Sequence, residues 1–376
     1  MIRLGVPVEQ FWHRVPGGTG RATYGTLRAL ADAAPAAGGG VEPRLLAAWH
    51  RPSHRRPPGL GELGPVRFAP LPRPLLYESW LRLGRPRVEP WTGPVDVVWA
   101  AAMVMAPSLA PVVATVHDLG FLDHPERSSR RGRDFFPRAW ARVGERAAAV
   151  VCPSQVVADD CARHGLDPAR VRVVPWGVDA TPVGDAEAEA ARRRHGLPAT
   201  FALWVGTLEP RKNLDRLVAA IGQVPGLHLA VAGPAGWNLD GRDVLAPLAE
   251  RIHRLGPVTN AELGALYRAA AVFVFPSLLE GFGLPVLEAM AQGTPVVTSA
   301  GTATAEAAGD AALLVDPLDV DALAAAVASV LNDPALAADL ARRGRRRAAE
   351  RSWAATAAGY AAVFRHVVTV CGARAD

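Results

Sequence analysis

Residues 201–213 read FALWVGTLEPRKN, and this stretch decides the fold that we expect. Its first five residues form a short apolar run of strand length, and Gly206 ends that run. Asn213 is a residue type that often caps a helix, and apolar residues then recur at helical spacing over 214–221. The stretch therefore predicts a strand, a loop and a helix in succession, which is the repeating unit of an α/β protein.

Comparable strand-like runs occur on both sides of this stretch. Before it they cover 2–8, 95–100, 112–116, 149–152 and 171–174, and after it 227–232, 272–275, 295–298 and 312–315. Helical patterns lie between several of them, notably 133–148 and 155–164, and a glycine-rich turn over 17–20 precedes another at 23–31. Alternating strands and helices predict an α/β fold with parallel sheets covered on both faces, arranged as two Rossmann-like, doubly wound domains.

We place the first domain at 1–182 and the second at 183–352, with a charged, alanine-rich linker over 184–196. The helical segment 353–376 is expected to pack back on the first domain. Residues 51–87 are rich in arginine and proline, and they predict an irregular, basic excursion of the first domain.

Length and composition agree with two domains that each bury a core. The chain has 376 residues, 50% of them hydrophobic and 20% charged, which excludes a disordered tail and a small disulfide-stapled scaffold. The net charge of +5 is a thin excess that favours anionic small molecules or a membrane surface no less than nucleic acid. Cys152, Cys161 and Cys371 lack metal-ligand spacing, so we expect buried thiols in a reducing compartment.

The expected location is the cytoplasm. Arg3 and Glu9 interrupt any apolar core of a secretory signal, and Pro107 and Pro111 divide the uncharged stretch 97–116 into two strand-length runs. Peripheral contact with the inner face of the membrane stays open. Trp49 with Arg51, Arg55 and Arg56, and the run 75–80, could touch anionic lipid or a lipid-linked acceptor, or form a solvated loop over a small helix.

The loop after the strand 201–205 carries the first candidate site. It contains Arg211 and Lys212, and Lys212 is the only lysine of the chain. Ligands of open α/β sheets bind at the carboxyl ends of the strands, and two cations beside a helix N-terminus form an anion site suited to a diphosphate. The alternative is a solvated pair of basic residues.

A second candidate site follows the strand at 272–275. Pro285 suits a first helical turn, so 281–284 is expected to be a loop that presents backbone N–H groups at a helix N-terminus. Glu280 precedes that loop and Glu288 lies about one turn inside the helix, so one ligand could meet both carboxylates. Carboxylates accept hydrogen bonds from sugar hydroxyls. Alternatively, Glu280 caps the helix and Glu288 is a surface residue.

These residues resemble the family 4 glycosyltransferases, which are retaining enzymes of the GT-B architecture and include bacterial mannosyltransferases. The family hallmark, two glutamates separated by seven residues, is matched by Glu280 and Glu288, and a Gly-x-x-x-x-Arg-Lys-Asn stretch is matched by 206–213. The resemblance covers nearly the whole chain. Further matching segments in the family's order are Gly17 to Gly20, Val116 to Leu119, Pro175 to Asp179 and Ala308 to Ala311.

The resemblance implies two Rossmann-like domains facing each other across a cleft, and it implies roles for named residues. Lys212, helped by Arg211, would hold the donor's diphosphate, Glu280 the transferred sugar and Glu288 the ribose, while His117 would face the reacting centre. The implied catalytic residues are therefore His117, Arg211, Lys212 and Glu280. The implied donor-binding residues are Gly17, Gly18, Gly206, Thr207, Gly281, Phe282, Gly283, Leu284 and Glu288.

Three residues depart from the family pattern. Many relatives have arginine where Thr207 stands, so Arg211 or another cation must supply one phosphate contact. Trp176 stands where asparagine is common, and Trp99 where histidine is common. The two tryptophans lie in or near the first domain, where acceptors bind, so the acceptor is left open.

The activity that the resemblance implies is transfer of a hexosyl group from GDP-mannose, or else a UDP-sugar, to a glycan or lipid-linked acceptor with retention of configuration. No acidic motif suggests a metal between the phosphates, so we expect no metal and no cofactor beyond the nucleotide-sugar co-substrate. Two alternatives stay open. A basic nucleic-acid-binding protein would need stacking aromatics interleaved with basic residues, but aromatics make up only 6% of the chain. The second alternative is an epimerase or a phosphorylase with the same two-domain fold.

Overall fold

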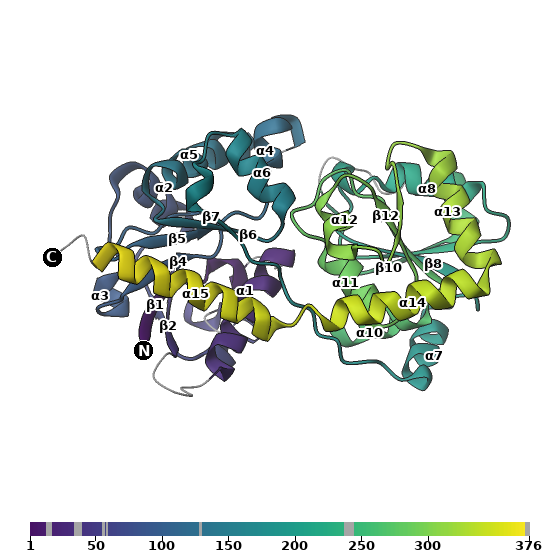
Figure 1. Cartoon of the computed structure of the whole chain (residues 1–376), viewed down its shortest axis with the longest axis horizontal. Coiled ribbons are helices and arrows are strands. Elements are labelled where there is room, and N and C mark those ends of the chain that lie inside the picture. Colours follow the sequence, from purple (N-terminus) through teal and green to yellow (C-terminus); the bar gives the residue numbers. More distant parts are fainter. Residues whose placement is uncertain are drawn as a thin grey trace. The chain divides into compact units, whose positions relative to one another are not determined.

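A computed structural model describes residues 1–12, 17–33, 40–54, 57, 59–127, 130–236 and 244–372 (Figure 1). The chain separates into two compact units: Met1–Gly177 with Trp353–Asp376, and Val178–Ser352. Each unit is built on one parallel sheet with helices around it, so the predicted α/β class is confirmed. The chain leaves the first unit after Gly177, earlier than the boundary expected at residue 182.

The sheet of the first unit has the strand order β3-β2-β1-β4-β5-β6-β7, and every neighbouring pair is parallel. The order reverses between β1 and β4, so strands are added outward in both directions from this pair. The strands are β1 (Ile2–Pro7), β2 (Val41–Ala47), β3 (Val66–Phe68), β4 (Val97–Ala100), β5 (Val112–Thr115), β6 (Ala149–Cys152) and β7 (Val171–Val173).

Helices bury both faces of this sheet, as continuous apolar strands require. On one face Leu27 and Phe364 share a core with Trp99, and on the other Trp80 and Val143 share a core with Val98. The helices of the unit are α1 (Gly17–Asp32), α2 (Arg73–Leu83), α3 (Glu89–Thr92), α4 (Gly120–Asp123), α5 (Arg130–Arg146), α6 (Gln155–Arg163) and α15 (Trp353–Gly372).

The last helix, α15, belongs to the first unit and lies beside α1 (Figure 1). Gly25 of α1 permits this contact, because a Cβ atom there would come within 2.5 Å of the Trp353 ring. A buried polar chain ties α15 to the sheet: Trp99 Nε1 donates to Thr115 Oγ1 at 2.8 Å, and Thr115 Oγ1 lies 3.0 Å from the Tyr360 hydroxyl.

The second unit has a six-stranded parallel sheet in the order β10-β9-β8-β11-β12-β13, which reverses between β8 and β11. Its strands are β8 (Phe201–Val205), β9 (His228–Ala232), β10 (Ile252–Gly256), β11 (Val272–Phe275), β12 (Val296–Ser299) and β13 (Leu313–Val315). Its helices are α7 (Asp185–Arg194), α8 (Leu214–Gly222), α10 (Asn260–Ala269), α11 (Leu284–Ala291), α12 (Ala303–Ala308), α13 (Val320–Asn332) and α14 (Pro334–Ala349).

Two segments differ from what their sequences predict. The expected linker 184–196 contains helix α7, which packs against α10 within the second unit through a face that includes Ala188 and Ala191. Acidic residues in the first turn and arginines in the last turn favour this helix through its dipole. The expected excursion at 51–87 contains β3 and α2, although Arg55 and Arg56 lie outside the described residues.

The glycine-rich turn was also predicted in the wrong form. Helix α1 begins at Gly17, so 17–20 forms the first helical turn and does not precede the helix. Among residues 17–20, only Gly17 has a left-handed backbone, with φ at +59°, which glycine adopts without the steric cost of a Cβ atom.

One helical stretch in the part of the chain that the structure describes, 334–372, is long and apolar enough to cross a membrane by length and composition alone. The structure divides it between α14 and α15. Tyr360 and Phe364 of α15 are buried in the core of the first unit.

Candidate functional site

The candidate site lies where the strand order of the second sheet reverses. Strands β8 and β11 are neighbours there, and each is followed at its carboxyl end by one of the two motifs that the sequence singled out. Open α/β sheets bind ligands outside the carboxyl ends of their strands at such a reversal. The motif 206–213 and the motif beginning at Glu280 therefore share one edge of one sheet.

The segment after β8 turns tightly before helix α8. Pro210–Lys212 forms a single 3-10 turn, and Asn213 follows with a left-handed backbone at φ +58°. Asn213 precedes the helix as predicted, but its side chain does not cap it. The Asn213 amide instead donates to the carbonyls of Pro276, at 2.9 Å, and Pro317, at 2.6 Å, so it ties the β8 loop to the loop after β11.

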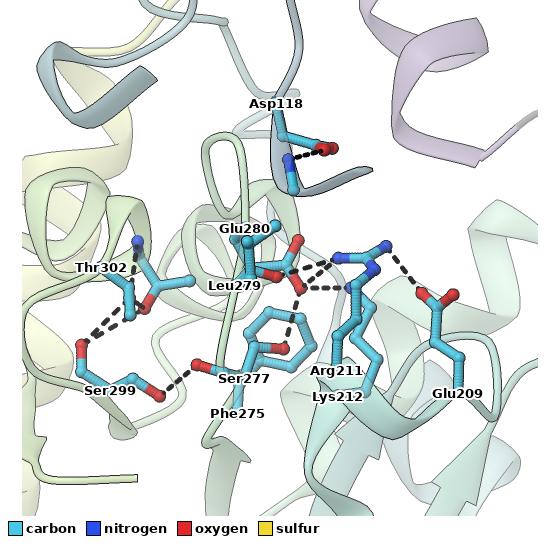
Figure 2. A network of polar contacts seen from close by, with 12 residues as sticks. Asp118, Glu209, Arg211, Lys212, Phe275, Ser277, Leu279, Glu280, Ser299 and Thr302 are labelled. Carbon is cyan, nitrogen blue, oxygen red and sulfur yellow. Dashed lines mark hydrogen bonds and ion pairs between the residues drawn. The ribbon is translucent and has the colours of Figure 1, made fainter. Parts of the chain in front are cut away.

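The two motifs meet in an ion-paired cluster (Figure 2). Lys212 Nζ lies 2.5 Å from Glu280 Oε1, and Arg211 Nη1 lies 3.1 Å from the same oxygen. Ser277 Oγ donates to that oxygen at 2.8 Å, and Lys212 Nζ also lies 4.8 Å from the centre of the Phe275 ring. The structure thus brings together three of the predicted site residues, Arg211, Lys212 and Glu280.

Glu209 belongs to the same cluster, although the sequence did not single it out as a site residue. Its Oε1 lies 2.6 Å from Arg211 Nη2, and Glu209 is 4% exposed. Arg211 therefore bridges two carboxylates, Glu209 and Glu280. The signal that could have found Glu209 is its place next to Pro210, two residues before a basic pair at the end of a buried strand.

Burial and charge act against each other on these groups. Burial raises the pKa of Glu280, but the charges of Lys212 and Arg211 outweigh it and hold the pKa below its usual range. Burial lowers the pKa of Lys212, and the Glu280 carboxylate opposes that shift. Burial raises the pKa of Glu209 although Arg211 and Lys212 oppose it. The cluster thus holds two cations and two acids, which leaves little net charge before a ligand binds.

The loop after Glu280 is packed tightly within the second unit. Phe282 is 2% exposed, and Gly283 has φ +112° with Thr304 so near that a Cβ atom would lie 3.2 Å from it. Helix α11 begins at Leu284, so Leu284 belongs to the helix and not to the loop as predicted. Pro285 lies in the first turn, as expected.

The two hallmark glutamates are neither a helix cap nor a surface residue. Gly283, not Glu280, occupies the N-cap position of α11. Glu288 is 8% exposed and accepts a hydrogen bond from the Tyr267 hydroxyl at 3.2 Å. Both structural alternatives raised by the sequence are therefore wrong.

Gly206 and Thr207 directly follow β8. Gly206 N donates to the Ala232 carbonyl at 2.9 Å, which continues the ladder to β9. A Cβ atom at Gly206 would lie 3.2 Å from the Trp204 ring, which is a tight contact, and 3.6 Å from Lys212 Cε, so the lysine packs over this end of the strand.

The remaining predicted residues, Gly17, Gly18 and His117, belong to the first unit. His117 Nε2 lies 2.8 Å from the Ala101 carbonyl oxygen, which can only accept, so Nε2 carries the proton of the neutral ring. Nδ1 is buried with no hydrogen-bond partner among the described residues, and the Trp176 ring lies 5.3 Å away. Nδ1 can therefore accept a hydrogen bond from a ligand.

The buried ring of His117 predicts a pH effect on stability. Burial lowers its pKa below 6.5, and the Ala101 carbonyl and Asp118 only partly oppose this. As pH falls below about 6.5 the unfolded chain binds the proton more readily, so the free energy of unfolding decreases; above that pH the contribution is complete. We expect His117→Gln, which can still donate to Ala101, to weaken this loss.

Urea unfolding of both proteins between about pH 5 and pH 7.5 measures the difference. Parallel stability profiles for the wild type and His117→Gln would refute the assignment to His117. Burial and the charge of His228 also lower the pKa of His253, so His253 accounts for acid sensitivity that persists in the variant.

Both halves of the chain match known protein families. Residues 186–347 match the family model for glycosyl transferases group 1, and residues 16–181 match that for Glycosyltransferase Family 4. O-antigen chain mannosyltransferase B of Escherichia coli is 33% identical over 300 residues, which cover 75% of this chain and 77% of that protein.

Two solved structures share the fold. Sucrose-phosphate synthase from Thermosynechococcus elongatus superposes with a TM-score of 0.74 at 23% identity, covering 98% of this chain and all of that one. HepE from Anabaena, in complex with UDP and glucose, has a TM-score of 0.74 at 18% identity, with 97% and 100% covered. The molecule is thus a glycosyltransferase of the GT-B fold class.

Within that class, the chain belongs to glycosyltransferase family 4. The family resemblance inferred from its motifs is confirmed.

Proposed function

We propose that this chain is a retaining hexosyltransferase that moves a hexosyl group, mannosyl first, from a nucleotide-diphosphate sugar to a hydroxyl of a glycan or lipid-linked acceptor. One observation carries the proposal. Lys212 and Arg211 contact Glu280 at the reversal of the second sheet, so cations for a diphosphate and a carboxylate for a sugar stand side by side (Figure 2).

The cations act on the leaving group. As the bond from the anomeric carbon to the phosphate oxygen breaks, negative charge grows on the departing diphosphate, and fixed cations beside it lower the barrier. Arg211 and Lys212 supply this charge, and Glu209 holds the Arg211 guanidinium from its other side. In this proposal no metal ion is needed between the phosphates. The acceptor hydroxyl attacks from the leaving-group side, and its proton passes to the departing phosphate.

The other residues position the donor. Glu280 and the backbone of Gly281 to Leu284 hold the hexose, and Glu288 holds the ribose. Gly206 and Thr207 line the phosphate side of the same sheet edge, and Gly17 and Gly18 bind the phosphates from the first unit. The neutral ring of His117 accepts a hydrogen bond from a hydroxyl of the hexose through Nδ1.

The O-antigen mannosyltransferase supports a mannosyl donor and a role in polysaccharide synthesis, and GDP-mannose is the mannosyl donor that the sequence motifs favour. The HepE complex with UDP and glucose makes a UDP-sugar the second choice. We place the enzyme in the cytoplasm, with acceptors at the inner face of the membrane. Trp49, 44% exposed, and Leu75, 58% exposed, are apolar contacts that such a surface would use.

A thermal-shift panel of GDP, UDP, ADP and their sugar conjugates tests the proposal. A ligand bound only by the folded state raises the free energy of unfolding, by about 2.7 kcal/mol at a hundredfold excess over its Kd, and therefore raises the melting temperature. We expect GDP and GDP-mannose to give the largest shifts, with UDP and UDP-sugars next. No shift with any nucleotide would refute a nucleotide-sugar site. Product analysis separates the alternatives, because sugar interconversion or phosphorolysis without acceptor transfer would indicate an epimerase or phosphorylase.

A further inference from the structure

Glu9 is a buried acid at the carboxyl end of β1, the strand at which the order of the first sheet reverses. It is 1% exposed. Its Oε1 accepts a hydrogen bond from the Ala48 backbone at 2.5 Å and lies 3.2 Å from His50 Nε2. Glu9 therefore joins the end of β1 to the segment that follows β2, at the edge of the sheet where α/β proteins bind ligands.

Two polar atoms at this edge have no hydrogen-bond partner among the described residues. They are the second carboxylate oxygen of Glu9, Oε2, and the amide nitrogen of the neighbouring Gln10, Nε2. Gln10 is 3% exposed. A buried polar group without a partner destabilises the folded protein, so an acceptor and a donor of this kind on consecutive residues indicate a binding site more than a structural one.

An aromatic stack lies beside Glu9. The rings of Trp12 and His50 stack with centroids 4.3 Å apart, and Trp12 Nε1 donates to the His54 carbonyl at 2.5 Å. The buried carboxylate thus lies next to a flat, weakly polar surface, a combination that suits a ring carrying hydroxyl groups.

We propose that Glu9 and Gln10 recognise the acceptor, and that the acceptor portion they bind is a hydroxylated six-membered ring, a pyranoside or a cyclitol. Glu9 Oε2 accepts a hydrogen bond from one ring hydroxyl and Gln10 Nε2 donates to a neighbouring ring oxygen. His50 contacts Glu9 and stacks on Trp12, and both rings are half-buried, so we place the bound ring against this stack. This inference rests on the proposed function, because it assigns the second substrate of that reaction.

Two substitutions separate recognition from a structural role. Glu9→Gln keeps an oxygen for the Ala48 N–H and replaces the unpartnered oxygen with an amide donor. Gln10→Met keeps the length of the side chain and removes the unpartnered amide. A purely structural Gln10 would lower the melting temperature when replaced, whereas removal of an unpartnered buried amide leaves it unchanged or higher. Glu42→Gln, at an exposed carboxylate of β2, is the matched control.

The assay measures release of nucleoside diphosphate from GDP-mannose or UDP-glucose, first with water as the only acceptor and then with methyl α-mannopyranoside, N-acetylglucosamine or myo-inositol. We expect at least one probe to accelerate release by the wild type. Glu9→Gln and Gln10→Met should each raise the KM for that probe about tenfold or more. The donor KM and the hydrolysis rate should stay within about twofold, as they should in Glu42→Gln.

Several outcomes would overturn the inference. They are a wild type that hydrolyses donor but responds to none of the probes, an unchanged probe KM in both variants, or a donor KM that rises with the probe KM. If Glu9→Gln does not fold, Gln10→Met decides alone. A wild type that neither binds nucleotide nor releases it from either donor refutes the proposed function, and this inference falls with it.

Discussion

Lys212→Ala is expected to reduce sugar transfer by about 100-fold to 1,000-fold, the loss that follows removal of one preorganised group from a developing negative charge. Lys212 Nζ lies 2.5 Å from Glu280 and the side chain is 9% exposed, so little solvent competes with it. No other lysine exists in the chain to replace it. Steady-state release of nucleoside diphosphate from the donor, with acceptor present, measures the loss.

The control for this prediction is a cation of the same unit outside the site. Arg193 on α7 is 66% exposed and pairs with Glu189, so Arg193→Ala should leave transfer unchanged. Because Lys212→Ala leaves a buried carboxylate partly unpaired, melting temperatures must show that the variant is folded. Near-normal turnover by a folded Lys212→Ala protein would show that this lysine does not stabilise the departing diphosphate.

Glu280→Ala is expected to lower turnover by about 100-fold or more while nucleoside diphosphate binding is kept or becomes tighter. Glu280 Oε1 neutralises Lys212 and Arg211 in the present structure, so its removal leaves both cations available to phosphate. The hexose loses its hydrogen-bond acceptor at the same time. Calorimetric binding of GDP and UDP, set beside the turnover number, measures the two effects separately.

Glu280→Gln supplies the control for folding. It keeps an oxygen for the Ser277 hydroxyl, 2.8 Å away, and removes only the charge. Its turnover should lie below that of the wild type and its nucleotide affinity should not fall. If either variant lost turnover and nucleotide affinity in equal measure, Glu280 would be a structural residue of the β11 loop.

The sequence predicted ten of the thirteen strands in the described residues and missed β2, β3 and β10. Strands β6, β8 and β11 have the bounds that their apolar runs predict. Strand β2 contains Glu42, Pro43 and Arg44, and strand β10 contains His253 and Arg254. Such mixed runs do not stand out from loops. Helix α7 was mistaken for a linker because its apolar face consists of alanines.

The sequence predicted the site residues that lie in the motifs after β8 and β11. It did not predict which further carboxylates are buried. Arg211, Lys212 and Glu280 share one sheet edge because β8 and β11 are neighbours, an order that the family resemblance implies. Glu209 lies inside the first motif, but only the structure shows its pairing with Arg211, and Glu9 lies outside both motifs. A lone glutamate reads as a surface residue until the structure shows it buried, at 4% and 1% exposure.

The most direct test of the central claim, that the ion-paired cluster binds a diphosphate, is a calorimetric comparison of GDP with GMP and of UDP with UMP, in the wild type and in Lys212→Ala. We predict that the wild type binds one diphosphate at least about tenfold more tightly than its monophosphate, a difference of about 1.4 kcal/mol, and that Lys212→Ala abolishes this preference. Equal affinity for diphosphate and monophosphate in the wild type, or an undiminished preference in the variant, would contradict the account.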